Sequence, residues 1–237
     1  MASDCAGRRR TVDGEQPVNW YDRWILPRLI DVSMRNRETR RYRERIIPQA
    51  AGRVLEIGFG SGLNLPFYSA EVKQLFALEP SLELRGIAGR RIGGAPFPIE
   101  LLDRSAEDIP LERASVDTVV TTWTLCTIPD AARALAEVQR VLTPAGTLLF
   151  VEHGLAPDVR VQTWQHRLNP LWNRIGGGCN LNRKIDALIA GSGFRLSELH
   201  MEYIRGLKPL GFTYSGRAEP LVDPAAARLD PGVESRV

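Results

Sequence analysis

The chain has 237 residues, of which 43% are hydrophobic and 25% are charged, and its formal net charge is +3. This is the composition of an ordinary globular protein, with enough chain for one large domain or two small ones. The small net charge gives no reason to expect a nucleic-acid partner. A run of about 18 apolar residues does not occur, so the sequence predicts no membrane-spanning helix.

The three cysteines, Cys5, Cys126 and Cys179, are far apart in the sequence, and no C-x-x-C pair occurs. This usage predicts a reduced, cytoplasmic protein without a disulfide framework, a zinc finger or another metal site. The arginines at 8–10 are followed by no apolar segment, so we expect no signal peptide. The oligomeric state is left open.

Composition divides the chain into four segments. They are a leader predicted to be disordered (1–16), an N-terminal helical cap (17–47), the main domain (48–217) and a disordered tail rich in proline and alanine (218–237).

The helical cap carries two patterns. The first is an amphipathic stripe of Trp20, Trp24, Ile25, Leu29 and Ile30. We expect this stripe to pack into the core, with an active-site mouth or a lipid surface as the alternatives. The second pattern is the arginine-rich segment 34–45, which we expect to form a solvated helix face rather than a contact with an anionic surface.

The main domain alternates short apolar segments with helical patterns. Strands are predicted at 53–58, 72–80, 98–103, 115–123 and 146–153. A helix is expected to begin after the N-cap Asp130 and to end before Pro144, with one face formed by Ala131, Leu135, Val138 and Leu142. Strands that alternate with helices predict a parallel sheet.

The last two predicted strands, 194–204 and 210–216, follow a short helix at 185–191 and have no helix between them. Such an ending predicts an antiparallel hairpin. We therefore expect an α/β fold, with a Rossmann-like, seven-stranded, mostly parallel sheet, helices on both faces and an antiparallel C-terminal hairpin.

The strongest functional signal is "VLEIGFGSGLN" (54–64), a strand that runs into Gly58, Gly60 and Gly62 and then, by expectation, into a helix. A dinucleotide-binding turn would hold a pyrophosphate, which a carboxylate at Glu56 would repel. S-adenosylmethionine (SAM) carries a sulfonium and an ammonium instead, and a nearby glutamate suits both cations. Glu79, at the end of the second strand, is placed to accept hydrogen bonds from a ribose.

With these residues the chain resembles the class I SAM-dependent methyltransferases from about residue 48 to residue 216. The resemblance implies an enzyme that uses SAM and releases S-adenosyl-L-homocysteine. "RSAEDIPL" (104–111) is similar to the adenine loop of that class, and "TTWTLCTIPD" (121–130) is similar to the segment that lines the methyl-transfer site. The implied cofactor-binding residues are Glu56, Gly58, Gly60, Gly62, Asn64, Glu79, Pro80, Ser105, Ala106, Glu107, Thr122 and Leu125.

A narrower resemblance rests on "WYDRWILPRLID", "CTIPD", "VEHG", "WQHRLNPLWNRIGGGCNLNR" and "PLGFTYSG". This combination is similar to the small-thiol S-methyltransferases of animals and their bacterial relatives, which implies a thiol or sulfide acceptor. Membrane contact is expected to be peripheral at most. The alternatives are a phospholipid N-methyltransferase at a membrane surface, a metalloid methyltransferase, and a SAM-binding regulator without chemistry.

Five residues are candidates for the acceptor side of the site. His153 follows the fifth strand, at the sheet edge where open α/β sheets bind ligands, and Cys126 follows the fourth strand. Cys179, Asn180 and Arg183 belong to "GGGCNLNR" (176–183), which we interpret as a cap over the acceptor. The sequence sets no His–Asp pair beside Cys179, and it shows no third metal ligand close to the two cysteines.

Overall fold

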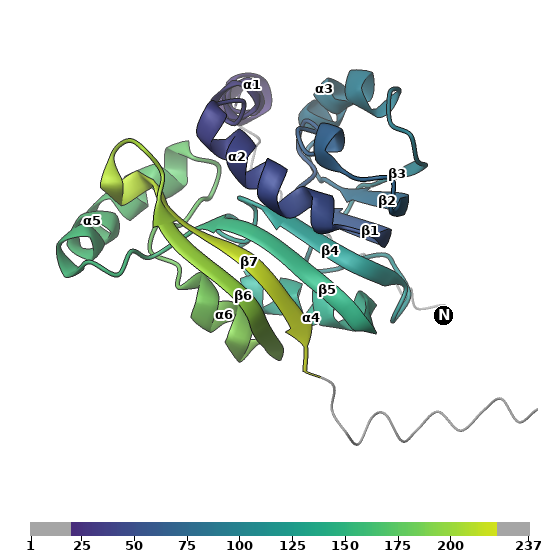
Figure 1. Cartoon of the computed structure of the whole chain (residues 1–237). Helices are drawn as coiled ribbons and strands as arrows, with labels where there is room; N and C mark the ends of the chain where they lie inside the picture. The colour runs from purple at the N-terminus through teal and green to yellow at the C-terminus, as the bar shows by residue number, and fades with distance from the viewer. Residues whose placement is uncertain (1–19, 222–237) are drawn as a thin grey trace, which may run out of the picture.

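The computed structural model describes residues 20–221 and shows one seven-stranded sheet (Figure 1). The strand order is β3-β2-β1-β4-β5-β7-β6. Strands β1 to β5 are parallel, whereas β7 is antiparallel to both β5 and β6. The bounds are Gly52–Ile57 (β1), Val72–Leu78 (β2), Ile99–Leu102 (β3), Val116–Thr122 (β4), Leu142–His153 (β5), Phe194–Tyr203 (β6) and Phe212–Pro220 (β7). The expected fold class is confirmed.

Helices cover both faces of the sheet because successive strand residues point to opposite sides. On one face Val54, Val120 and Leu149 pack with α2 (Arg37–Ile46) and α3 (Leu82–Ile92). On the other face their neighbours in the strands pack with α4 (Ala131–Val141) and α6 (Ile185–Gly191). The α5 helix (Val159–Ile175) and the N-terminal α1 (Leu26–Ser33) lie toward the carboxyl ends of the parallel strands (Figure 1).

The predicted helix after Asp130 is present, and the side chain of Asp130 accepts a hydrogen bond from Arg133 N at 3.0 Å. Its predicted end is wrong by one residue. Leu142 is the first residue of β5, not the last on the helix face, and it pairs with Val116. Pro144 is the reason, since the chain just ahead of a proline favours an extended backbone.

The helix predicted directly after the glycine turn is absent. Only a single 3-10 turn, Leu65–Phe67, follows Gly62, and Tyr68 then adopts an extended backbone. The side chain of Asn64 does not cap this turn, because it bonds to other side chains of the site.

The antiparallel hairpin extends further than predicted, because β7 runs to Pro220 and so includes the first residues of the predicted tail, from Ala218. The rest of the tail from residue 222, and the predicted leader at 1–16, lie outside the described residues. Among residues 20–221, no helix has the length and apolar character needed to cross a bilayer.

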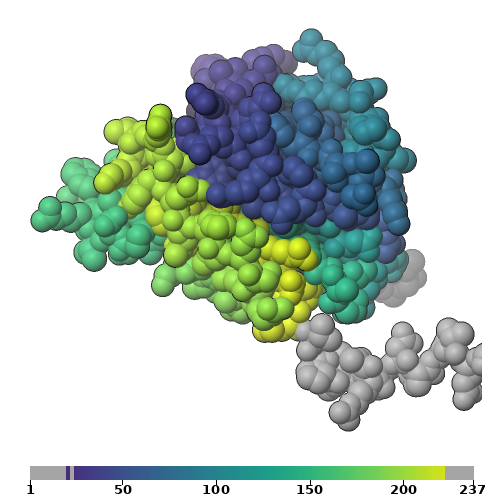
Figure 2. All heavy atoms as spheres, viewed as in Figure 1, coloured from purple at the N-terminus to yellow at the C-terminus, as the bar shows by residue number. Residues whose placement is uncertain are grey.

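The N-terminal helices pack against the main domain. A π-helical turn, Tyr21–Ile25, leads into α1, and the 3-10 turn Ile47–Gln49 connects α2 to β1. Figure 2 shows these residues (purple) filling the space between the C-terminal strands (yellow-green) and the early strands (blue) on the viewed face. Buried Tyr42, Ile46 and Ile47 fix this position.

Candidate functional site

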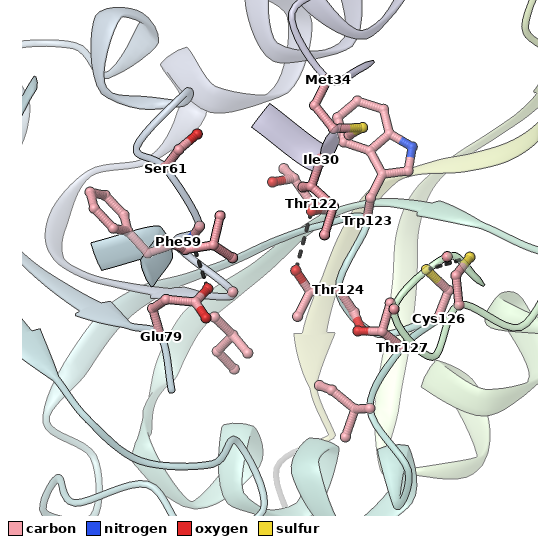
Figure 3. Close-up of a pocket in the computed structure, with 18 of the residues that line it drawn as sticks. Ile30, Met34, Phe59, Ser61, Glu79, Thr122, Trp123, Thr124, Cys126 and Thr127 are labelled. Carbon is pink, nitrogen blue, oxygen red and sulfur yellow. Dashed lines mark hydrogen bonds between the residues drawn. The ribbon is translucent and has the colours of Figure 1, made fainter. Parts of the chain in front are cut away.

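A cavity of about 600 Å³ opens at the carboxyl ends of the parallel strands. Its floor is formed by residues at the strand ends, among them Glu56, Leu78, Thr122 and His153. Its walls are formed by α1, the glycine turn, the loop after β4 and the loop at 176–179. Glu79 and Cys126 lie on opposite sides of this space (Figure 3). The volume is in the range of sites for small molecules and cofactors.

Most of the predicted site residues line this cavity. The exceptions are Gly62, Glu107, Leu125, Asn180 and Arg183. The cavity thus joins residues from the glycine turn to residues of the "GGGCNLNR" loop, which lie more than a hundred positions later in the sequence.

The glycine turn is held beside Glu79. Gly60 N and Ser81 N donate to the two carboxylate oxygens of Glu79, each at 2.9 Å. Burial raises the pKa of Glu79, while these backbone donors lower it. Gly60 has a φ of +58°, and a Cβ placed there would meet nothing closer than Gly58 O at 3.8 Å, so a ligand can approach the backbone closely.

Glu56 lies beneath the turn and is 1% exposed. Its carboxyl oxygens accept hydrogen bonds from Asn64 Nδ2 at 2.8 Å and from the Tyr68 hydroxyl at 2.7 Å. Asn64 Nδ2 also donates to Thr122 Oγ1 at 3.0 Å. Burial outweighs these bonds and raises the pKa of Glu56 to about 8.

Arg43 joins the same network, although its segment was expected to be solvated. It is 5% exposed, its Nε donates to Asn64 Oδ1 at 2.9 Å, and its guanidinium lies 5.1 Å from the centre of the Trp123 ring. The expectation of a solvated face holds for exposed neighbours such as Arg40, which pairs with Glu44 at 2.7 Å. The charge run gave no signal for which arginine would be buried.

These residues fit SAM, because two acidic groups lie where the cavity meets the glycine turn. Each Glu79 oxygen uses one acceptor position on the backbone and keeps another for a ribose hydroxyl. Glu56, as a carboxylate, would favour the ligand's ammonium over a phosphate. Ser105 and Ala106, from the loop that resembles an adenine loop, also line the cavity.

The pKa of Glu56 predicts a pH dependence of SAM binding. The free protein holds a proton on this carboxyl up to about pH 8, whereas a bound ammonium favours the carboxylate. The affinity should therefore rise by about tenfold or more between about pH 6 and pH 8. Calorimetric titration with SAM across this range measures the effect, and in Glu56→Gln the slope should be lost. A wild-type affinity that is flat across this interval would contradict this role for Glu56.

Glu107 and Leu125 have positions that differ from the cofactor contacts implied by the resemblance. The Glu107 carboxylate accepts from Asp130 N at 2.8 Å and from Ser105 Oγ at 3.1 Å, so it braces the loop from outside the cavity. Leu125 is fully buried in the core beneath α4. Both neighbour the cavity in sequence, but their side chains point away from it.

The loop after β4 is held by Glu152, a residue that the sequence analysis missed. Glu152 is fully buried, and it accepts hydrogen bonds from Thr124 N at 3.0 Å and Cys126 N at 3.1 Å. Burial raises its pKa. Trp123, at the start of this loop, has a φ of +54°. A single acid within the apolar segment "LLFVEH" was the available signal for Glu152.

Cys126, His153 and Cys179 come together at the far end of the cavity. Cys179 Sγ lies 3.4 Å from Cys126 Sγ and 3.7 Å from His153 Nδ1. The expectation that no third metal ligand lies near the two cysteines is therefore wrong. The hydrogen bond between the two sulfurs lowers the pKa of Cys179 and raises the pKa of Cys126.

Asn180 and Arg183 connect the loop at 176–183 to the loop after β4 through hydrogen bonds. Asn180 N and Nδ2 both donate to Cys126 O, at 2.9 and 3.0 Å. Arg183 Nη1 donates to the carbonyl oxygens of Leu125 and of Ile128, the latter at 2.8 Å. Their N–H groups are thus used on backbone carbonyls, and neither residue lines the cavity.

The aromatic stripe of the N-terminal helices was expected to pack into the core, but in the structure it lies beside the cavity, where α1 forms a roof. Leu29 and Ile30 of the stripe line the cavity together with Leu26 and Met34. The Tyr21 hydroxyl donates to Ile175 O at 3.1 Å, which joins the N-terminal helices to α5. Trp20 and Trp24 remain 66% and 54% exposed, so they are not core residues. Packing over an active-site mouth, one of the alternatives, describes this segment.

Residues 55–150 match the family model of a methyltransferase domain. The chain is 33% identical over 167 residues to thiol S-methyltransferase TMT1B of Homo sapiens, a match that covers 65% of this chain and 64% of the relative. It is 32% identical over 105 residues to phosphatidylethanolamine N-methyltransferase of Cereibacter sphaeroides, over 43% of this chain and 51% of that protein.

A crystal structure of a SAM-dependent methyltransferase from Methanosarcina mazei superposes with a TM-score of 0.60 at 18% identity, over 74% of this chain and 95% of that one. This likeness supports the fold. The chain spans a little under two thirds of the length of the thiol S-methyltransferases it matches. The matched domain (55–150) contains the second half of β1, all of β2 to β4 and most of β5, and so most of the lining around Glu79.

Proposed function

We propose that this chain, whose residues 55–150 match a methyltransferase domain, transfers a methyl group from SAM to a small thiol or to sulfide. SAM is the cofactor, and when bound it supplies an electrophilic methyl group and leaves as S-adenosyl-L-homocysteine. The acceptor sulfur forms a bond to this methyl carbon as the bond to the sulfonium breaks. The acceptor proton is lost to solvent or to a protein group.

The observation that supports a thiol acceptor is the character of the cavity end beyond Glu79. Its walls there include Met34, Trp123, Ile128 and the two cysteines. Such a lining favours a small, soft, weakly hydrated acceptor over a strongly charged one. The similarity to thiol S-methyltransferases supports the same class of acceptor.

The residues of the chain have three tasks in this reaction. Glu56, Glu79 and the glycine turn would hold the cofactor, and they set its position relative to the acceptor. The roof residues Leu26, Ile30 and Met34 exclude water from the acceptor end. The thiol must become a thiolate from an ordinary pKa of about 8.5, and His153 is the imidazole that lies in this part of the cavity.

Incubation of the full-length chain with SAM and a panel of small thiols, including sulfide, tests the proposal. Methyl thioethers, or methanethiol from sulfide, should be detected by mass spectrometry. Cys179→Ser should keep its SAM affinity and change turnover, because this residue lies at the acceptor end. Absence of methylated product from every thiol, in a preparation that binds SAM, would refute the assignment.

A second candidate is a phospholipid N-methyltransferase, favoured by the exposed apolar side chains near the mouth. Trp20, Trp24 and Leu29 are all more than half exposed, and a phosphatidylethanolamine N-methyltransferase is among the similar proteins. Such residues suit a membrane interface. Vesicles that contain an ethanolamine phospholipid discriminate the two candidates. Methylated lipid in place of methylated thiol would establish this alternative.

A further inference from the structure

We propose that Cys126, His153 and Cys179 form a binding site for a thiophilic divalent metal ion such as Zn²⁺. Two thiolates and one imidazole are a set that zinc uses in catalytic sites, where the fourth position is left for water or a substrate. The three residues come from the loop after β4, the end of β5 and the cap loop. They are separated by 26 or more positions in the sequence.

The distances fit one tetrahedral ion. Two sulfurs at about 2.3 Å from zinc lie roughly 3.8 Å apart, and a sulfur and an imidazole nitrogen lie roughly 3.5 Å apart. The observed separations are 3.4 Å between the sulfurs of Cys126 and Cys179, and 3.7 Å between Cys179 Sγ and His153 Nδ1. The three ligand atoms all lie within 4.8 Å of one another. Small side-chain rotations are enough to bring them to bonding distance.

Hydrogen bonds to backbone groups hold the two cysteine loops together without a metal ion. Asn180 N and Nδ2 bond to Cys126 O, and Arg183 bonds to Ile128 O at 2.8 Å on the same loop. Glu152 anchors this loop from below through Cys126 N at 3.1 Å. The ligand positions are thus set by the fold, which lowers the cost of ordering them when a metal binds.

Charge and access also suit a divalent ion. Two thiolates and a neutral imidazole together balance its charge, and the carboxyl of Glu152 lies behind Cys126. All three ligands line the cavity, so the remaining coordination position faces the acceptor end.

The open position gives the metal a role, and this part of the inference rests on the proposed function. An acceptor thiol that coordinates such an ion gives up its proton to solvent and binds as a thiolate. The sulfur would then be held at the acceptor end in its nucleophilic form. The metal would thus take the place of an imidazole base in preparing the acceptor.

Titration of the full-length, reduced protein with Co²⁺, a spectroscopic substitute for zinc, tests the site. We expect one Co²⁺ per chain, with a thiolate-to-cobalt charge-transfer absorption that added Zn²⁺ removes. Cys126→Ser and Cys179→Ser should each bind Co²⁺ at least about tenfold more weakly and lose most of this absorption. Cys5→Ser, at the cysteine outside the described residues, and His200→Ala, at an exposed histidine, should behave as the wild type.

Thermal unfolding and SAM binding of each variant identify any that fail to fold. The proposal is overturned if the wild type shows no thiolate-to-cobalt absorption. It is also overturned if Cys126→Ser and Cys179→Ser both keep this absorption. Undiminished thiol methylation after complete chelation would remove the role of the metal and leave the proposed function standing. A normal cobalt spectrum without turnover of any thiol would remove the proposed function and leave the metal site standing.

Discussion

Gly58→Ala should destabilise the chain by about 3 kcal/mol or more and abolish SAM binding. Gly58 has a φ of +72°, and a Cβ built there would lie 2.1 Å from Thr124 Oγ1 and 2.5 Å from Thr124 Cγ2. The new methyl group would push apart the glycine turn and the loop after β4, which form two walls of the cavity. Urea unfolding and calorimetric titration with SAM measure the two effects.

Two other glycines provide the controls for this variant. Gly60→Ala has a similar backbone, with a φ of +58°, but its Cβ meets only Gly58 O at 3.8 Å. The free energy of unfolding of Gly60→Ala should fall by only about 1–2 kcal/mol, which is the cost of placing alanine in a left-handed backbone conformation. Gly86→Ala, in α3 with no atom within 4 Å of its Cβ, should be neutral or slightly stabilising. Equal stability of Gly58→Ala and Gly60→Ala would show that the clash with Thr124 does not destabilise the protein.

Glu152→Ala should cost about 3–5 kcal/mol in the free energy of unfolding and remove acceptor turnover. The substitution leaves Thr124 N and Cys126 N buried without their carboxylate acceptor, and it leaves a cavity beneath the loop. The loop would then rearrange, and with it the position of Cys126 relative to Cys179. Denaturant unfolding and the thiol methylation assay are the measurements.

Glu152→Gln keeps one acceptor oxygen and nearly the same volume, so its cost should be smaller, about 1–2 kcal/mol. Glu198→Ala, at a solvent-accessible position of β6, should stay within about 0.5 kcal/mol of the wild type. A Glu152→Ala protein as stable as the Glu198→Ala protein would contradict the anchoring role of this buried carboxyl.

Local patterns were sufficient for the sheet and for the part of the cavity lining around the glycine turn. Short apolar segments alternating with helical ones predicted the parallel strands, and the missing helix between the last two segments predicted the hairpin of β6 and β7. Glu56, the glycines and Glu79 could be predicted because a few neighbouring residues form the whole turn, and the second strand ends beside it.

Predictions from the sequence were wrong where a local pattern was compatible with more than one structure. The glycine turn predicted a helix, but Asn64 bonds to Glu56 and Thr122 and does not cap one. Similarly, the arginine-rich helix gave no indication that Arg43 would turn inward toward Asn64. Both outcomes depend on side chains that only the packed sheet brings within reach.

From the sequence alone, the α/β fold class could be predicted, as could the glycine turn and three residues that line the cavity, Cys126, His153 and Cys179. Only the tertiary structure decided that Cys126, His153 and Cys179 meet, that Asn180 and Arg183 brace the cap, and that Glu152 anchors the loop. The physical reason is the range of the interactions. Strand and turn signals arise between neighbours along the chain, whereas this cluster forms where separate crossover connections end at the same edge of the sheet.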